Sequence, residues 1–280
     1  MTSPVLLITG TSSGIGLESA VAAARHGFRV VATMRDLDKA EPLRAAAGEA
    51  GVDLDLQRLD VTDERSVADC IGYIREAYGR LDALLNNAGA GHVGTIELET
   101  IDDVRSVMEV NFFGVVSLTR AALPLLRESR GRVVTVSSVG GVVGQPFNEA
   151  YCAAKFAVEG FMESLTPVAA TVGVRVTVVE PGAVSTEFVA NVGLDANHPA
   201  YGTPYEPAFS AYLARTAGAF DPSVAQAPEG VAGVILGVLD AEQPPARIQT
   251  SENAVRFAGI KLSDLDGSHV QAVTAHWMQG

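Results

Sequence analysis

Short runs of aliphatic and β-branched residues alternate along this chain with longer stretches of helical character, and no other feature constrains the fold as strongly. The short runs predict strands at Val5–Thr9, Arg29–Met34, Asp53–Asp60, Ala83–Asn86, Arg132–Ser137, Arg175–Glu180 and Ala246–Thr250. Helices are expected between them, at 14–26, Asp36–Ala50, Asp63–Tyr78, 102–129, Tyr151–Thr171 and Pro228–Asp240. Continuous apolar runs are typical of parallel strands that are covered on both faces. The pattern therefore predicts an α/β fold, a doubly wound parallel sheet with helices on both faces.

The chain reads as one domain over residues 1–280. It has 280 residues, of which 48% are hydrophobic, so it can bury a full core without a second domain. No linker divides it, but the segment 183–226 contains four of the prolines, Pro199, Pro204, Pro207 and Pro222. A loop of this length inside a domain is usually functional, so we expect 183–226 to be a substrate-binding lid.

The charge and cysteine content exclude several classes of partner. The net charge of −13 and the lack of a Lys/Arg run argue against nucleic acid. Cys70 and Cys152 form no metal or disulfide pattern. The N-terminus lacks a signal pattern, and apolar runs such as Val231–Leu239 fall short of the ~20 residues of a membrane helix. We expect a cytoplasmic protein without a membrane partner.

The first expected strand runs into a turn of glycines and small residues. These are Thr9, Gly10, Thr11, Ser12, Ser13, Gly14, Ile15 and Gly16. Glycines let a backbone approach a pyrophosphate closely, and the N–H groups of the following helix bind its charge. An ordinary strand–turn–helix with small residues is the alternative. We expect Gly10–Gly16 to bind the diphosphate of a dinucleotide.

The residues after the second strand bear on the choice between NAD(H) and NADP(H). NAD enzymes usually carry a carboxylate there that binds the ribose, but this chain has Met34 followed by Arg35. A guanidinium can clamp a 2′-phosphate through charge-assisted hydrogen bonds, and Ser13 offers a further donor. Asp36 could instead pair with Arg35 at the surface. The sequence favours NADP(H), with NAD(H) as the alternative.

Two further strand ends should face the same crevice. Asp60 and Val61 close the third strand, where the carboxylate could accept a hydrogen bond from the adenine or could cap the next helix. Asn87, Ala88 and Gly89 follow the fourth strand. They could form only a turn, but a turn at this position also abuts a bound dinucleotide. We expect cofactor contacts from both groups.

Ser138, Tyr151 and Lys155 are the candidate catalytic residues. Tyr151 and Lys155 are four residues apart and share one helix face, and an ammonium beside a phenol lowers the phenol pKa toward neutrality. Such a hydroxyl can act as acid or base. Ser138 ends the fifth strand, so the two hydroxyls could hold one carbonyl oxygen while hydride reaches its carbon. A YxxxK spacing alone is weak, and its weight comes from the order of the motifs.

Two neighbouring polar residues have competing interpretations. Asn111 lies among apolar residues and needs a partner, either in helix packing or in the site. Cys152 could suggest a nucleophile, but it lies off the helix face of Tyr151 and Lys155, and no histidine is spaced to activate it. The histidines show no metal pattern.

This order of motifs resembles that of the short-chain dehydrogenase/reductase family from Pro4 to about Thr250. The matching motifs are Thr9–Gly16 (TGxxxGIG), Asn86–Gly89 (NNAG), Asn111, Ser138, Tyr151–Lys155, and Pro181-Gly182 followed by Thr186. The resemblance is greatest to the 17β-hydroxysteroid and retinol dehydrogenase branch, in the runs Val31–Asp36, Ser137–Gly141 and Pro146–Ala157. The Ala-, Gly- and Val-rich composition is typical of a bacterial member.

The resemblance implies a single Rossmann-like domain and a role for each matching residue. Tyr151 would be the general acid/base, and Ser138 would orient the substrate carbonyl. Lys155 would bind the nicotinamide ribose and tune Tyr151, while Asn111 would hold a water that links Lys155 to solvent. Further cofactor contacts would come from Pro181, Gly182, Val184 and Thr186. Members of this branch use NADP(H), and the family forms homodimers or homotetramers through two long helices.

The expected substrate cleft is apolar. Val139–Phe147 and the segment 183–226 should line it, mostly with Val, Gly, Pro, Phe, Tyr and Ala side chains. Beside the catalytic hydroxyls, Gly140 and Phe147 are the expected substrate contacts. Such a lining suits a hydrophobic ketone or secondary alcohol. Phe209 and Tyr212 could instead merely pack the lid.

Three functions remain open from the sequence. The first is an NADP(H)-dependent oxidoreductase of hydrophobic ketones and alcohols. The second is a ketoreductase of acyl or polyketide intermediates in secondary metabolism. The third is a non-catalytic NADP(H)-sensing protein, although such proteins typically lose the active-site tyrosine or lysine. Phe156, Phe161 and Met162, near these two residues, are expected to be core rather than pocket.

Overall fold

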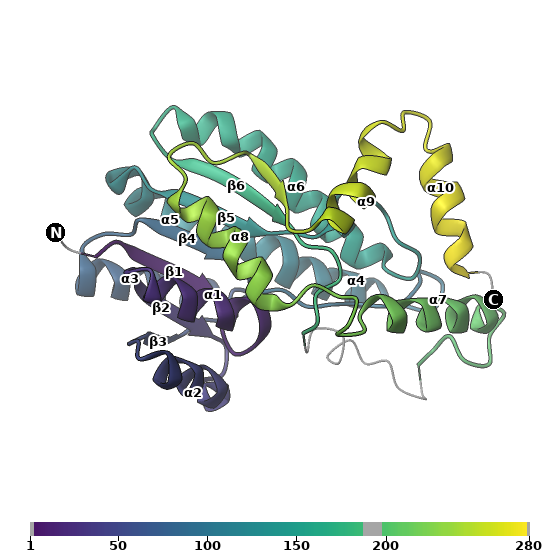
Figure 1. Ribbon diagram of the computed structural model, residues 1–280, viewed down its shortest axis with the longest axis horizontal. Helices are drawn as coiled ribbons and strands as arrows, with labels where there is room; N and C mark the ends of the chain where they lie inside the picture. The colour runs from purple at the N-terminus through teal and green to yellow at the C-terminus, as the bar shows by residue number, and fades with distance from the viewer. Residues whose placement is uncertain (1–2, 187–197, 279–280) are drawn as a thin grey trace.

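The computed structural model describes residues 3–186 and 198–278, which are built around one seven-stranded sheet (Figure 1). Every strand pairs in parallel with its neighbours, in the order β3-β2-β1-β4-β5-β6-β7. The strands are β1 (Val5–Thr9), β2 (Arg29–Met34), β3 (Asp55–Arg58), β4 (Ala83–Asn86), β5 (Arg132–Val136), β6 (Arg175–Glu180) and β7 (Arg247–Gln249). The predicted α/β class is confirmed. Because the chain reverses its winding between β1 and β4, a crevice is expected at the carboxyl ends of these two strands.

Helices cover both faces of the sheet. They are α1 (Gly14–Arg25), α2 (Glu41–Ala50), α3 (Glu64–Tyr78), α4 (Ile101–Met108), α5 (Gly114–Ser129), α6 (Glu149–Ala170), α7 (Glu206–Ala219), α8 (Pro228–Asp240), α9 (Glu252–Leu262) and α10 (Ser268–Ala275). Leu6 and Ile8 of β1 are buried in the cluster that contains α1, α2 and α8. Val5 and Leu7 are buried in the cluster of α3, α5 and α6. Burying each such side chain contributes roughly 1.5–3 kcal/mol, which is why the strands are apolar on both faces.

The expected helix Asp36–Ala50 is divided in the structure. Asp36 caps a 3-10 turn, Leu37–Lys39, by accepting a hydrogen bond from the backbone N–H of Asp38 at 3.0 Å. Helix α2 begins only at Glu41, because Pro42 has no N–H to donate and fits the first turn of a new helix. The cap predicted at Asp36 is present, but on a shorter element.

The expected helix 102–129 is also divided. Between α4 and α5 the chain forms a π-helical turn, Glu109–Phe113, that contains Asn111. Such turns occur often at functional sites. In contrast, Pro167, where we expected a kink or a boundary, lies inside α6 without ending it.

The C-terminal part of the chain adds helices that the sequence analysis did not anticipate. Part of the segment 183–226 is helix α7 rather than loop, while residues 187–197 of this proposed lid lie outside the described residues. Helices α7, α9 and α10 lie beyond the carboxyl end of the sheet (Figure 1). Trp277 joins them, because its ring stacks on Phe257 and lies 4.3 Å from the guanidinium carbon of Arg215 on α7.

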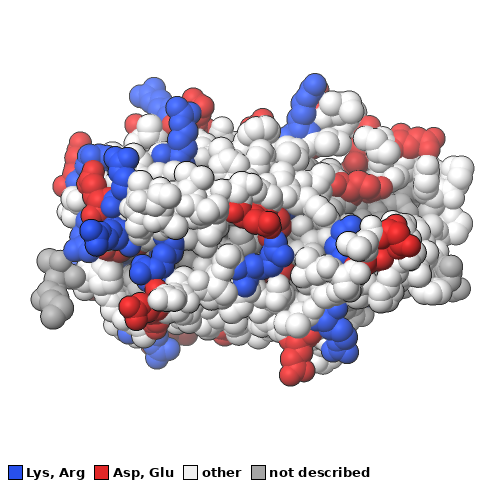
Figure 2. Space-filling model, turned by 90° about the horizontal axis from the view of Figure 1, so that it is seen from above, with Lys and Arg blue, Asp and Glu red and all other residues white. Residues whose placement is uncertain are grey.

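Helix length and surface charge bear on the expected partners. Among the described residues, only Ile101–Ser129 is long and apolar enough to cross a membrane by length and composition. Val115, Leu118 and Leu125 of this stretch are buried in the core, as in the core helix of a soluble protein. On the face in Figure 2, the Lys and Arg side chains mostly lie beside Asp and Glu and do not merge into one basic patch.

Candidate active site

The glycine turn between β1 and α1 admits only small residues. Gly10 and Gly14 have positive φ angles of 69° and 55°, which side-chain-bearing residues rarely adopt. A Cβ on Gly16 would lie 2.1 Å from the carbonyl oxygen of Gly10. Ser13 is the N-cap of α1, but its side chain makes no capping hydrogen bond. This open cradle at a helix N-terminus fits the close approach of a diphosphate.

Asn87, directly after β4, holds the glycine turn in place. Its side-chain amide donates to the carbonyl oxygens of Thr9 and Gly10 at 2.9 and 3.0 Å. The backbone N–H groups of Asn87 and Ala88 both donate to Thr9 Oγ1, at 3.0 and 2.9 Å. A Cβ on Gly10 would lie 2.9 Å from Ala88 Cα. The end of β4 therefore lies directly against the turn, and the amide of Asn87 helps to shape it.

Arg35 follows β2 with an exposed side chain. Asp36, the alternative partner that the sequence offered, uses its carboxylate to cap the next turn through Asp38. Within residues 3–186 and 198–278, no ion pair joins Arg35 to Asp36. The guanidinium therefore stands at the end of β2 without an ion pair to Asp36, and the acidic group that its charge reaches is Asp60.

Asp60, at the end of β3, was expected either to contact adenine or to cap helix α3. Asp63 caps α3 instead, and Asp60 Oδ1 accepts hydrogen bonds from Thr62 N and Oγ1 at 3.0 and 2.7 Å. Burial opposes ionisation of Asp60, but the Thr62 hydrogen bonds and the charges of Arg35 and Arg58 hold the pKa of this carboxyl below its usual value. A carboxylate and two cations thus gather where β2 and β3 end.

Ser138, Tyr151 and Lys155 meet at the carboxyl edge of the sheet. Ser138 follows β5, and the other two lie on α6. The side chains of Ser138 and Tyr151 are hydrogen-bonded, and Ser138 Oγ also accepts the N–H of Gly140 at 3.0 Å. Lys155 Nζ lies 5.8 Å from the centroid of the Tyr151 ring and donates to the carbonyl of Val136 at 3.1 Å.

Burial governs the protonation of this pair. It raises the pKa of Tyr151 well above the ordinary value of 10, and the hydrogen bond with Ser138 opposes this only in part. The expected lowering of the Tyr151 pKa by Lys155 is therefore wrong for the protein by itself, because the ammonium lies over the ring and bonds a backbone carbonyl. Burial lowers the pKa of Lys155 to about 8. Near neutral pH, Tyr151 is a protonated phenol beside a largely charged ammonium.

Asn111 connects the π-helical turn to the loop after β4. It is fully buried, and its amide donates to the carbonyls of Val107 and Ala90, each at 3.0 Å. Its oxygen accepts the N–H of Ala90 at 3.2 Å. A Cβ on Gly89 would lie 2.9 Å from Asn111 Oδ1 and 3.6 Å from Lys155 Nζ. Asn111 is thus both a packing residue and a neighbour of the lysine.

The loop after β6 returns over the glycine turn. The carbonyl of Pro181 accepts the N–H of Val139 at 2.9 Å. A Cβ on Gly14 would lie 3.0 Å from Thr186 Cγ2. The side chain of Val184 is buried in the core, so its backbone is the part that can reach a ligand. Of the predicted residues of this loop, Thr186 is therefore the one that lies against the glycine turn.

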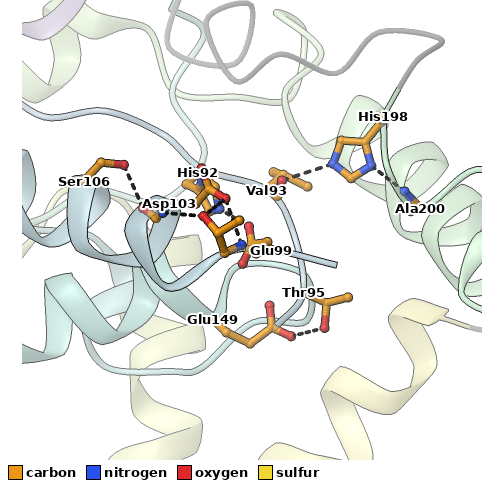
Figure 3. Close-up of polar contacts among 10 residues, drawn as sticks. His92, Val93, Thr95, Glu99, Asp103, Ser106, Glu149, His198 and Ala200 are labelled. Carbon is orange, nitrogen blue, oxygen red and sulfur yellow. Dashed lines mark hydrogen bonds and ion pairs between the residues drawn. The ribbon is translucent and has the colours of Figure 1, made fainter. Parts of the chain in front are cut away.

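The loop at 90–100, which follows β4, forms a rim of polar contacts (Figure 3). His92 pairs with Glu99 across this loop. Thr95 Oγ1 donates to Glu149 at the start of α6 at 2.8 Å. The rim loop is therefore tied to the helix that carries Tyr151.

His198 joins the rim loop to the segment that leads into α7. Its Nε2 lies 3.2 Å from the carbonyl of Val93, and its Nδ1 accepts the N–H of Ala200 at 3.2 Å (Figure 3). The imidazole also stacks on Phe209, with ring centroids 4.3 Å apart. This histidine had no role in the sequence analysis, since the rim loop that it contacts through Val93 lies far away in the chain.

The two expected substrate contacts fall in different places. Gly140 lies beside the catalytic hydroxyls, since its Cβ would be 3.3 Å from Ser138 Oγ. Phe147 is only 5% exposed and packs against Phe209 and Tyr212, with centroid distances of 5.3 and 5.4 Å. Its ring is part of the core under α7, so the packing alternative for these aromatic residues describes the structure.

Other candidates near the site have simpler roles. Burial raises the pKa of the Cys152 thiol to about 11, the opposite of what a nucleophile needs. The described residues contain no group of three or more His, Cys, Asp or Glu side chains that could hold a metal. Phe161 and Met162 belong to the core, but Phe156, which we expected there, is 40% exposed.

One residue beside Lys155 was missed. Glu159, one helical turn further along α6, is 6% exposed. The i, i+4 spacing that linked Tyr151 to Lys155 also links Lys155 to Glu159, so the signal was present in the sequence.

Comparisons with known proteins show what this chain is similar to. The profile of the family described as short chain dehydrogenase matches residues 4–197. Human retinol dehydrogenase 8 is 42% identical over 275 residues, covering 94% of this chain and 86% of that protein. Human 17-beta-hydroxysteroid dehydrogenase type 1 is 40% identical over 287 residues, covering 96% and 84%. A solved variant of actinorhodin polyketide ketoreductase with NADPH is 30% identical with a TM-score of 0.73, covering 88% of this chain and 95% of that one.

Proposed function

The chain belongs to the short-chain dehydrogenase family of oxidoreductases, and on that premise we propose that it is an NADP(H)-dependent enzyme that interconverts a hydrophobic ketone and a secondary alcohol. The observation that carries the proposal is the meeting of Ser138, Tyr151 and Lys155 at the sheet edge that also carries the glycine turn. The phosphate-binding turn and the proton donor would then lie at the same crevice, at the carboxyl ends of the strands.

The residues around the glycine turn fit a nicotinamide dinucleotide. Gly10, Gly14 and Gly16 leave a cradle that a Cβ would fill, and Arg35 is exposed at the end of β2, where an NAD enzyme usually has a carboxylate. Arg35 would hold the 2′-phosphate of NADP(H), because Asp36 is engaged with the backbone of Asp38. When bound, the nicotinamide supplies or accepts the hydride.

Tyr151 would act as the proton donor in the direction of ketone reduction. Its raised pKa keeps the phenol protonated at neutral pH, and Ser138, hydrogen-bonded to it, would hold the same carbonyl oxygen. The charged Lys155 over the ring would stabilise the phenolate that proton transfer leaves behind. Asn111, against the loop next to Lys155, would hold a water for return of the proton. General acid catalysis of this kind contributes about 10²- to 10⁴-fold to a rate.

The substrate class rests on the relatives. Val142 and Val143, expected to line the cleft, pack instead against Ala258 and Val270 of α9 and α10. Two of the curated relatives are a retinol and a hydroxysteroid dehydrogenase. The similarity to a polyketide ketoreductase supports reduction of an acyl or polyketide intermediate as the second candidate. A purely NADP(H)-sensing role is disfavoured because Tyr151 and Lys155 are both present.

We further propose a homodimer or homotetramer. Ile101, Phe113 and Phe156, on α4, the π-helical turn and α6, are 57%, 49% and 40% exposed. Val168 on α6 is 63% exposed. Apolar side chains repeated along neighbouring helices mark an association surface more often than a solvated one.

The proposal is tested by replacing Tyr151 with phenylalanine. NADPH oxidation is followed with a panel of steroid ketones, other hydrophobic ketones and β-ketoesters. Turnover of any substrate that the wild type accepts should fall at least about 10²-fold, while NADPH binding stays within a few-fold. Tyr73→Phe, which removes a hydroxyl bonded to Asp55 far from the site, is the matched control. Full activity in Tyr151→Phe would overturn the assignment.

A further inference from the structure

Two buried glutamates lie behind the catalytic lysine. Glu159 on α6 is 6% exposed, and Glu180 at the end of β6 is fully buried. Ser137, next to the candidate catalytic Ser138, is 4% exposed and lies close to Glu159. The proposed reaction uses none of the three side chains, yet burial of carboxyl groups is costly unless each is paired.

A single arginine serves both carboxyl groups. Arg247 Nε, on β7, lies 2.7 Å from Glu180 Oε1 and 3.5 Å from Glu159 Oε2. Its Nη2 lies 3.0 Å from the exposed Glu163 on α6. Two carboxyl groups that approach one guanidinium nitrogen this closely also approach each other. In a buried site, the repulsion between two such groups favours one shared proton over two negative charges.

Hydrogen bonding also indicates a proton on this pair. Ser137 and Arg247 are the donors that reach Glu159 and Glu180, yet several oxygens of the pair are buried without a well-aligned hydrogen bond to the described residues. Two ionised carboxyl groups have no donor to offer each other, and such an arrangement is destabilising in a buried site. One proton on Glu159 turns an acceptor into a donor toward Glu180, which keeps the charge because it lies nearer to Arg247.

The pair is connected to the active site through packing. A Cβ on Gly141 would lie 2.6 Å from Ser137 Oγ, 3.0 Å from Glu159 Cγ and 3.1 Å from the carbonyl oxygen of Lys155. The carboxyl pair therefore lies against the loop that carries Ser138 and against the helical turn that carries Lys155. A change of charge at Glu159 therefore acts electrostatically on the Lys155 ammonium, one helical turn away.

We propose that Glu159 and Glu180 share one proton, and that Glu159 is a positioning residue that releases this proton before Lys155 loses its own, so that the ammonium stays charged. The role of Lys155 in this inference rests on the proposed function, whereas the shared proton does not. Above neutral pH the ionised Glu159 then holds the proton on Lys155.

The order of the two titrations follows from the surroundings. Burial, together with the charge of Glu180, raises the pKa of Glu159 to about 7, against the opposing effects of Ser137, Arg247 and Lys155. Burial lowers the pKa of Lys155 to about 8, and Glu159 is the group that opposes this. As pH rises, the carboxyl therefore ionises first. Without it, the Lys155 pKa falls further.

The shared proton is tested on the protein alone by infrared spectroscopy across pH. The C=O band of a protonated carboxylic acid should disappear as pH passes about 7 in the wild type. Glu163→Gln, which replaces an exposed side chain, should show the same band with the same pH dependence as the wild type. Glu159→Gln should lack the band. A wild type without a carboxylic acid that titrates near neutrality would overturn the inference. Since neither cofactor nor substrate is needed, this failure is distinct from failure of the proposed function.

The effect on Lys155 is tested by the pH dependence of kcat. In Glu159→Gln the alkaline limb should move to lower pH by about 1 unit or more, since the negative charge that favours the charged form of Lys155 has been removed. Glu163→Gln should leave the limb in place. Glu180→Gln should not move the alkaline limb to lower pH, because Glu159 then ionises more readily and its charge still acts on Lys155. Equal downward shifts in Glu159→Gln and Glu180→Gln would show a merely structural role and refute the positioning of Lys155.

Discussion

Replacing Gly16 with alanine probes the packing of α1 on the glycine turn. The new Cβ would lie 2.1 Å from the carbonyl oxygen of Gly10, 2.9 Å from its carbonyl carbon and 2.5 Å from Asn87 Nδ2. The first two atoms are backbone. Asn87 is held by the carbonyls of Thr9 and Gly10 at 2.9 and 3.0 Å. No neighbour can therefore give way without breaking a hydrogen bond or moving the turn.

The sign of the effect follows from competing magnitudes. Alanine is favoured over glycine inside a helix by about 0.5–1 kcal/mol. Overpacking against backbone costs about 1–3 kcal/mol, and loss of an Asn87 hydrogen bond costs about 1 kcal/mol more. Gly16→Ala should therefore lower the free energy of unfolding by about 1–3 kcal/mol. Gly72→Ala, inside α3 with no atom within 4 Å of its Cβ, should raise it by about 0.5–1 kcal/mol.

Urea denaturation of both variants measures the stability difference, and fluorescence titration measures NADPH binding. Because the turn must move in Gly16→Ala, we expect its NADPH affinity to fall by about tenfold or more, equivalent to about 1.4 kcal/mol. Gly72→Ala should bind as the wild type does. Equal unfolding midpoints for Gly16→Ala and the wild type would refute the close packing, and unchanged binding would refute the place given to the turn.

The remaining predictions concern the cofactor, the assembly and the pH dependence of folding. Arg35→Ala should weaken NADPH about 10- to 100-fold, as expected for a charged hydrogen-bond pair, and NADH hardly at all; an equal loss for both cofactors in titrations would rule out a phosphate clamp. Phe113→Asp should shift the protein toward monomers in sedimentation velocity, since Phe113 is half exposed on the proposed interface; a monomeric wild type would contradict this surface. Between the ordinary value of 4.5 and about 7, native Glu159 holds a proton that the unfolded chain has lost, so the free energy of unfolding should fall as pH rises through this window. Urea titrations in Glu159→Gln should show a smaller fall, and an identical slope would contradict the raised pKa.

Much of the fold could be predicted because its signals are local. A strand buried on both faces is mostly apolar, and the valine-rich runs in Val5–Thr9, Arg132–Val136 and Arg175–Glu180 carry that pattern. The sequence predicted a strand at Asp53–Asp60, but β3 spans only Asp55–Arg58. The ends of this edge strand are set by its pairing with β2, which the composition of the segment does not show. Helix α7 was hidden in a proline-rich segment, where Pro207 marks a helix start rather than a loop.

The candidate site divides in the same way. The glycine spacing at 10–16 and the four-residue spacing of Tyr151 and Lys155 are local, so the sequence alone determined the cradle and the paired side chains. Spacing in the sequence could not show whether Phe147 is exposed. It is buried under Phe209, which comes from α7, so its exposure depends on tertiary packing. A residue type can be assigned to a site from spacing, but its exposure follows from whatever packs over it.

Protonation was decided only by the tertiary structure. The sequence placed Lys155 beside Tyr151 and predicted a lowered phenol pKa, but burial by distant segments raises it. Glu159 lies four residues from Lys155 in the sequence, yet its partners Glu180 and Arg247 come from β6 and β7. Desolvation and Coulomb energies depend on the distances and burial that the whole fold creates. The spacing in the sequence therefore determined that Tyr151 and Lys155 share one helix face, and the fold determined which groups join them and which of them carries the proton.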